Sequence, residues 1–169
     1  MKSQPIRKNQ CYTVFVLVET AVIRLTATTN KQYLISPGHQ SNTYPASAAY
    51  DWYITSENGG YTFTKIVEFR TEQAVDYVNI QRIGDKGEVL SGKLYRGHTG
   101  EGRIGETQCG GSNGLAVLFR SNSGPHNTGK FTIEYWKGNL YSSNVILQPE
   151  VLLESFSYFH LRPIDTQTK

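Results

Sequence analysis

The chain has only two cysteines, Cys11 and Cys109, among its 169 residues. A disulfide-dense small scaffold is therefore excluded, because at most one bridge can form within the chain. A bridge between Cys11 and Cys109 requires that the N-terminal segment stays on the chain. If that segment is removed, Cys109 is left alone, and a buried thiol and an intermolecular bridge are both open alternatives.

Most of the chain also lacks an excess of positive over negative side chains. The formal net charge is +3, but Lys2, Arg7, Lys8 and Arg24 stand against the single acid Glu19 in the first 30 residues and account for all of it. The remaining residues carry 13 basic and 13 acidic side chains. Nucleic-acid binding through phosphate neutralisation needs a basic face, so we expect no nucleic-acid partner.

The chain lacks an apolar run long enough to cross a bilayer, since about 20 residues are needed for ~30 Å of hydrocarbon. A basic segment, residues 1–8, precedes an apolar run over residues 11–23 and the small-residue site Leu25-Thr26-Ala27. This order predicts a secretory signal peptide over residues 1–27 and a secreted protein. Glu19 interrupts the apolar run, and a first core strand is the alternative for this segment.

Two common catalytic motifs are absent as well: the sequence contains no HExxH and no CxxC. Residues 100–105 match the dinucleotide pattern GxGxxG, but no amphipathic helix follows, so we expect a mobile surface loop over residues 97–114. The histidines fall in loops or the tail at spacings that suggest no metal triad: His39, His98, His126 and His160. We therefore predict that the protein is not an enzyme.

Strand patterns fill the rest of the sequence. Residues 115–120 and 131–136 alternate between inward and outward positions with a period of two, which is typical of strands with one face on a core. Between them, residues 121–129 contain no large apolar side chain. With aromatic and β-branched runs separated by Gly, Asn and Ser clusters, and no helical period before residue 148, the pattern predicts a β-sandwich.

Several ordered motifs occur between residues 33 and 136, and each is short. They are Ser36-Pro37, Tyr44-Pro45, Trp52-Tyr53-Ile54, the run from Ile66 to Glu72, Asp76-Tyr77-x-x-Ile80, and Leu115-x-Val117-x-Phe119-x-Ser121-Asn122 followed by Phe131 and Tyr135. As an ordered set they resemble the CUB domain family. The resemblance implies an all-β fold, a two-sheet antiparallel β-sandwich of the CUB jelly-roll type. It places a CUB-like domain at residues 31–136 and leaves residues 137–169 as a C-terminal extension.

The resemblance also implies a candidate calcium site, since calcium-binding CUB domains hold the ion with a Glu and two Asp residues from separate loops. The matching positions are Glu72, Asp76 and Asn122, with Glu68 as the alternative to Glu72. Asn122 replaces the last Asp, which lowers the number of negative charges from three to two and predicts weak calcium binding. The candidate contact surface for a ligand consists of Tyr44, Asp76, Asn122 and Ser123.

These observations favour a secreted, extracellular binding module for protein or carbohydrate ligands, resembling stand-alone, spermadhesin-like chains. The alternative is a structural or assembly component of an extracellular complex. Such a component would form homo-oligomers through Cys109 or through the apolar C-terminal tail, which contains Val151-Leu152-Leu153. A binder is expected to be a monomer or weak dimer, whereas an assembly protein is expected to form higher species.

Overall fold

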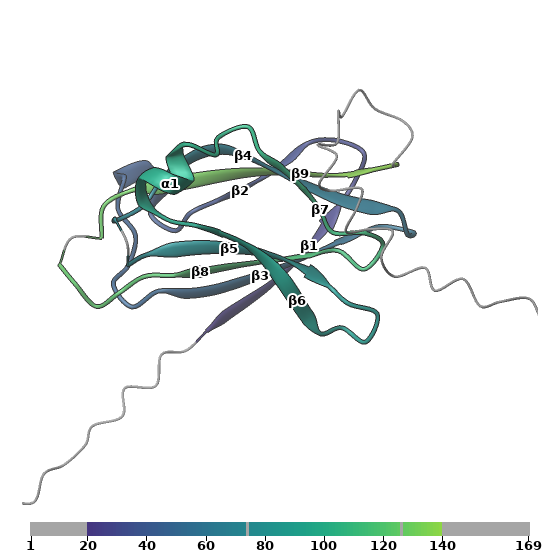
Figure 1. Cartoon of the computed structure of the whole chain (residues 1–169), viewed down its shortest axis with the longest axis horizontal. Coiled ribbons are helices and arrows are strands. Elements are labelled where there is room, and N and C mark those ends of the chain that lie inside the picture. Colours follow the sequence, from purple (N-terminus) through teal and green to yellow (C-terminus); the bar gives the residue numbers. More distant parts are fainter. Residues whose placement is uncertain (1–19, 74, 126, 140–169) are drawn as a thin grey trace, which may run out of the picture.

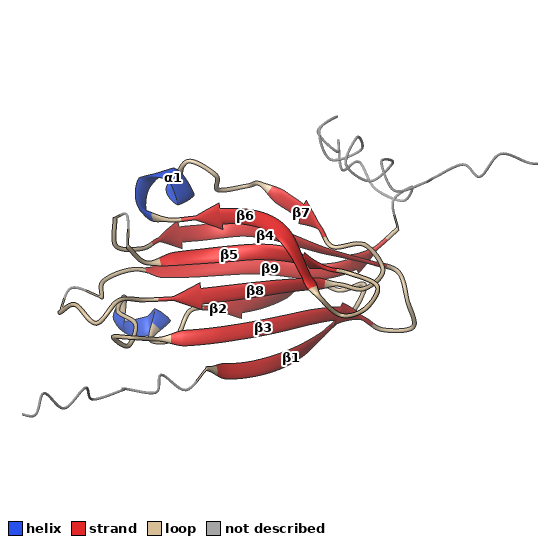
Figure 2. Ribbon diagram, turned by 60° about the horizontal axis from the view of Figure 1, so that its bottom comes forward, coloured by secondary structure: helices blue, strands red, loops and turns tan. Residues whose placement is uncertain are grey.

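Two β-sheets face one another and enclose the core, as Figures 1 and 2 show for a computed structural model that describes residues 20–73, 75–125 and 127–139. In this part of the chain the strands are β1 (Ala21–Ala27), β2 (Gln32–Ile35), β3 (Ala49–Ser56), β4 (Tyr61–Arg70), β5 (Tyr77–Ile83), β6 (Val89–Tyr95), β7 (Thr107–Cys109), β8 (Leu115–Arg120) and β9 (Lys130–Gly138). Two short helical turns, η1 (His39–Ser41) and α1 (Gly97–Glu101), lie between them. None of the helices described is long and apolar enough to cross a bilayer.

The strand order is β1-β3-β8-β5-β6 in the five-stranded sheet and β2-β9-β4-β7 in the four-stranded sheet. Neighbouring strands are antiparallel except β1 and β3, which run in parallel. The predicted all-β, two-sheet sandwich is thereby confirmed. The expected alternation holds for part of β9: Phe131, Ile133 and Tyr135 are buried and Thr132 is half-buried, but Glu134 is buried as well.

Aromatic rings fill the centre of the sandwich. Phe131 lies with its ring centroid 5.1 Å from Phe119, 6.2 Å from Trp52 and 6.4 Å from Phe69. Phe119 continues this contact to Tyr44, at 5.0 Å and nearly edge-on. Because offset and edge-on ring pairs add stabilisation beyond their buried area, this cluster fixes both sheets and the loop that carries Tyr44.

The glycine-rich segment is more structured than the sequence predicted. Instead of a mobile loop throughout, residues 97–114 contain α1 and the edge strand β7, whose Cys109 pairs with Phe63 of β4. Gly100 packs under the ring of Phe69, where an added Cβ would lie 2.1 Å from a ring carbon. The neighbouring strands are antiparallel, so the segment is not part of a βαβ nucleotide-binding unit.

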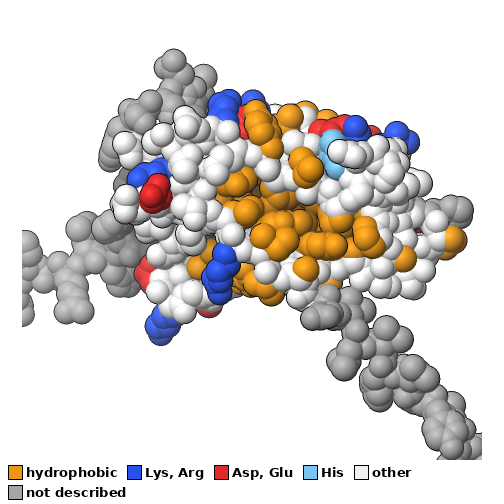
Figure 3. Space-filling model, turned by 180° about the vertical axis from the view of Figure 1, so that it is seen from behind, with side chains coloured by type: hydrophobic (Ala, Val, Ile, Leu, Met, Phe, Trp, Pro, Cys, Tyr) orange, Lys and Arg blue, Asp and Glu red, His pale blue; other side chains and the backbone are white. Residues whose placement is uncertain are grey.

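The edge strands β1 and β2 leave apolar side chains at the surface. Val22 and Ile23 of β1 are 58% and 37% exposed, and Tyr33 and Ile35 of β2 are 57% and 54% exposed. Figure 3 shows hydrophobic side chains gathered in the middle of one face of the molecule. The two edge strands therefore contribute much of the exposed apolar surface in the described residues.

The N-terminal strand lies within the segment predicted to be a signal peptide. β1 pairs with β3 over its whole length, Ala27 is fully buried, and Leu25 packs against the core. For residues 21–27 the structure thus has the strand that the sequence left as the alternative. The predicted signal segment otherwise falls outside the described residues, as do Cys11 and the C-terminal extension beyond residue 139.

This placement predicts the result of two truncations. A chain that starts at residue 28 loses β1 and uncovers Ile54, so we expect a loss on the order of 3 kcal/mol in the free energy of unfolding or a failure to fold. A chain that starts at residue 20 keeps β1 and is expected to match the full chain. Urea denaturation of both variants measures the difference, and equal stability would show that β1 contributes nothing.

Candidate functional site

Three connections meet at one end of the sandwich, on the left in Figure 1. β4 and β8 end there, and β3, β5 and β9 begin there, because neighbouring strands in these sheets are antiparallel. The β2–β3, β4–β5 and β8–β9 connections consequently approach one another. We call this the loop end, defined by residues 36–48, 71–76 and 121–129. The structure brings Tyr44, Glu72, Asp76 and Asn122 together here.

Asp76 is the centre of the loop end. Its side chain is fully buried. The Tyr44 hydroxyl donates a hydrogen bond to Asp76 Oδ2 at 2.5 Å, and the backbone N–H of Asn122 donates to Asp76 Oδ1 at 2.7 Å. A buried carboxylate is costly unless donors satisfy its oxygens, and both of its oxygens have one here. Asp76 therefore joins the other two loops to its own.

Asn122 connects the β8–β9 loop to Glu72. Its side-chain Nδ2 donates to Glu72 Oε2 at 3.1 Å, while its Oδ1 accepts a hydrogen bond from the backbone N–H of Gly124 at 2.6 Å. A backbone N–H can only donate and an ionised carboxylate can only accept. These two neighbours thus fix which end of the amide faces Glu72.

Further backbone contacts hold the loops in register. Ser47 N–H donates to the Asn122 carbonyl at 2.6 Å, and Tyr44 N–H donates to the Asn127 carbonyl at 3.1 Å. Ser121 Oγ donates to the Pro45 carbonyl at 2.7 Å. The loop end is therefore a hydrogen-bonded unit, and Ser123, the remaining predicted contact residue, is exposed at its surface.

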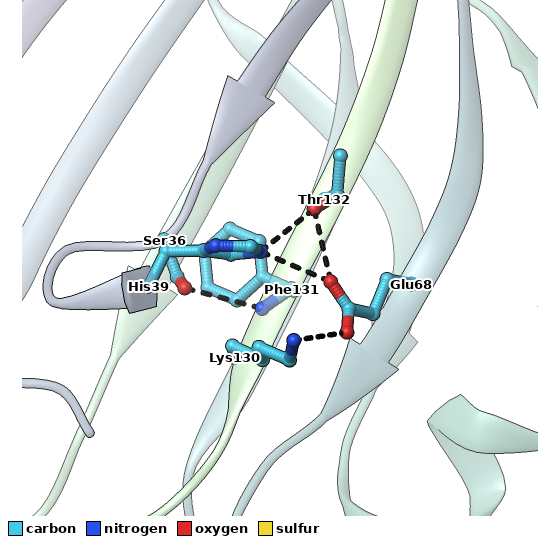
Figure 4. Close-up of polar contacts among 6 residues, drawn as sticks. All are labelled: Ser36, His39, Glu68, Lys130, Phe131 and Thr132. Atoms are coloured by element: carbon cyan, nitrogen blue, oxygen red, sulfur yellow. Dashed lines mark hydrogen bonds and ion pairs between the residues drawn. The ribbon is translucent and has the colours of Figure 1, made fainter. Parts of the chain in front are cut away.

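Glu68, the alternative ligand, lies away from this network. It follows a β-bulge in β4 and faces a different cluster, shown in Figure 4. Glu68 Oε1 pairs with Lys130 Nζ at 2.7 Å, and Oε2 lies 3.0 Å from His39 Nε2 and 3.3 Å from Thr132 Oγ1. The hydrogen bond from Lys130 lowers the pKa of Glu68, and His39 adds to this effect while partial burial opposes it. The geometry places Glu72, and not Glu68, beside Asp76 and Asn122.

The sequence did not predict this His39–Glu68–Lys130–Thr132 cluster. Its members lie in η1, β4 and β9: the pairing of β4 with β9 places Glu68 beside Thr132, and η1 brings His39 to both. A polar pocket of about 230 Å³ was also not predicted. It lies beside Glu72, and its lining is Arg70, Thr71, Glu72, Gln73, Gly97, Glu101 and Thr128. No local motif marks either feature, because each depends on contacts between distant segments.

As arranged, the residues at the loop end do not fit a calcium ion. Calcium takes six to eight oxygen ligands, yet the group that Asn122 directs at Glu72 is an N–H donor. Turning the amide round would place Nδ2 against the N–H of Gly124, which is also a donor. No group of three or more His, Cys, Asp or Glu residues within the described ranges could hold a metal ion. Calcium binding stays a prediction from the sequence that this arrangement does not favour.

Tyr44 links the hydrogen-bonded loop end to the core. Its hydroxyl also accepts the N–H of Glu72 at 3.0 Å, while its ring packs on Phe119. Burial raises the pKa of Tyr44 above its ordinary value, and the hydrogen bond to Asp76 adds to this effect. The phenol is therefore kept neutral in the folded state, where it acts as a donor to Asp76.

Replacing Tyr44 by Phe keeps the ring and removes the hydroxyl, which leaves Asp76 without one donor and the Glu72 N–H without its acceptor. We expect a loss of about 2 kcal/mol at pH 7. Because the folded-state pKa is raised, the hydroxyl's contribution is complete below about pH 10 and decreases as the pH rises further. The difference between wild type and Tyr44→Phe should therefore shrink above that pH.

Urea denaturation at pH 7, 9 and 10.5 measures this difference. Burial also raises the pKa of Tyr95, so both proteins lose stability in alkali and only the difference between them reports on Tyr44. A Tyr44→Phe variant as stable as wild type at pH 7 would contradict the role given to the hydroxyl.

The comparisons with known proteins concern the fold. No protein-family model and no curated protein matches the sequence. Among solved structures, the full extracellular region of zebrafish Gpr126/Adgrg6 matches with a TM-score of 0.58 and 22% identity, over 72% of this chain and 15% of that one. The CUB1-EGF-CUB2 domains of rat MASP-1 match with a TM-score of 0.55 and 21% identity, over 69% and 42%. This protein has the fold of a CUB domain, in agreement with the resemblance read from its sequence motifs.

Proposed function

We propose that this protein is a secreted extracellular binding module that recognises a protein ligand through its loop end. The observation that carries the proposal is the rigid network of Tyr44, Glu72, Asp76 and Asn122, which holds three loops together at one end of the sandwich. Loops fixed on a strand scaffold are common sites of recognition, because their exposed side chains are presented in a defined arrangement. The basic and then apolar order of the residues that precede β1 is typical of a signal peptide and supports secretion.

The surface next to the loop end is polar and carries charge of both signs. The pocket beside Glu72 includes Arg70 and Glu101 in its lining, and Ser123 lies exposed on the neighbouring loop. Such a surface favours hydrogen bonds and ion pairs with a partner. Exposed ion pairs contribute little affinity individually, so we expect binding to depend on several loops together.

Disulfide-linked assembly through Cys109 is less well supported. Cys109 is a free thiol, half-buried in β7, and burial raises its pKa. The thiolate is the reactive form, so a raised pKa decreases the fraction that can form a bridge. Cys109 is therefore a less reactive thiol for a covalently joined assembly.

A binding screen against purified extracellular domains and glycans tests the proposal with two matched variants. Ser123→Arg adds a large cation at the loop end, and Ser112→Arg makes the same change on an exposed loop at the opposite end. We expect Ser123→Arg to weaken protein binding about ten-fold or more, which corresponds to ~1.4 kcal/mol, and Ser112→Arg to change it little.

Three results would contradict the proposal. The first is a ligand whose binding is lost with Ser112→Arg and kept with Ser123→Arg, which would place the contact elsewhere. The second is selective glycan binding without any protein ligand. The third is sedimentation of the full chain as large species that reducing agent dissolves, which would favour the assembly role.

A further inference from the structure

The loop end contains two carboxylates that contact one residue, and the side chain of that residue is an amide. Glu72 and Asp76 both contact Asn122, the first through the side-chain Nδ2 and the second through the backbone N–H. The N–H groups of one residue therefore satisfy oxygen atoms from two acidic residues. In a metal site, a cation would supply the positive charge that these N–H groups supply in part.

We propose that Asn122 closes the loop end in place of a metal ion, so that the fold of this end is independent of calcium. This inference goes beyond partner binding and does not depend on it. The amide is neutral, and its Nδ2 carries two hydrogens, one of which is directed at Glu72 Oε2. Its other end is held by Gly124 N–H, so the side chain spans from the β8–β9 loop to the β4–β5 loop.

The side chain at position 122 determines whether the loop end needs a cation, because it sets the number of negative charges there. With Asn122, the loop end has the two carboxylates Glu72 and Asp76, and donors on Tyr44 and Asn122 face them. With Asp at position 122, the Nδ2 donor would be replaced by an oxygen facing Glu72 Oε2, and the number of carboxylates would rise to three. Like charges at such a distance repel, and a divalent cation relieves this repulsion.

Asp76 can take part in binding a cation in such a variant. A carboxylate oxygen has more than one lone pair, so Asp76 can keep its bonds to Tyr44 and to the backbone at position 122 and still ligate. The backbone contact from Ser47 N–H to the carbonyl of residue 122 does not involve the side chain. Substitution at this position therefore changes the chemistry of the loop end while its backbone contacts are kept.

The test compares the full-length wild type with Asn122→Asp and Asn122→Ala by thermal melts in chelator, in about 20 mM calcium and in the same concentration of magnesium. For wild type we expect no calcium-dependent shift in Tm. Asn122→Asp should melt lower than wild type in chelator and gain about 5 to 10 °C in calcium, as a dissociation constant near 1 mM predicts. Asn122→Ala should melt lower than wild type by the same amount in all three solutions.

Each other outcome overturns the inference. A wild-type Tm that rises in calcium would show that the loop end takes the ion despite the amide. An Asn122→Ala variant that melts like wild type in chelator would show that the amide does not hold the loops. An Asn122→Asp variant insensitive to calcium would show that the amide does not stand in for a cation. If Asn122→Asp folds only when calcium is added, titration calorimetry on the refolded protein gives the same answer as a rise in Tm.

Discussion

The buried carboxylate of Asp76 is the constraint on which the loop end depends. A carboxylate that is fully removed from solvent requires donors, and this chain supplies them from two other loops, by the Tyr44 hydroxyl and the Asn122 backbone. Because the Tyr44 hydroxyl and the Asn122 N–H must both reach the Asp76 carboxylate, their hydrogen bonds hold the three loops in place relative to one another. The exposed residues of the loop end, including Ser123, are therefore held in a defined arrangement.

The aromatic core is connected to this hydrogen-bond network through Tyr44. Tyr44 contacts Phe119 with its ring while its hydroxyl contacts Asp76, and Phe119 in turn contacts Phe131 of the other sheet. A single side chain thus belongs to both the apolar core and the polar network. This arrangement explains how surface loops stay ordered in a domain where no disulfide is formed among the described residues.

The strands could be predicted from the sequence because their alternation is a local property, as β8 and β9 illustrate. β7 and α1 could not, since a three-residue edge strand and a five-residue helix are too short to show a period. For the loop end, the order of the motifs predicted that Glu72, Asp76 and Asn122 belong to one site. It could not show that Asn122 directs an N–H at Glu72, because that depends on the position of Gly124.

The difference between Asn and Asp at position 122 is small in volume and large in chemistry. An amide brings its own donor to Glu72, so the carboxylate needs no external charge, whereas a third carboxylate would need one. A metal-closed loop end can respond to the calcium concentration around it, because its order depends on occupancy. An amide-closed loop end has no such dependence, so under our proposal its surface keeps the same shape whether calcium is scarce or abundant.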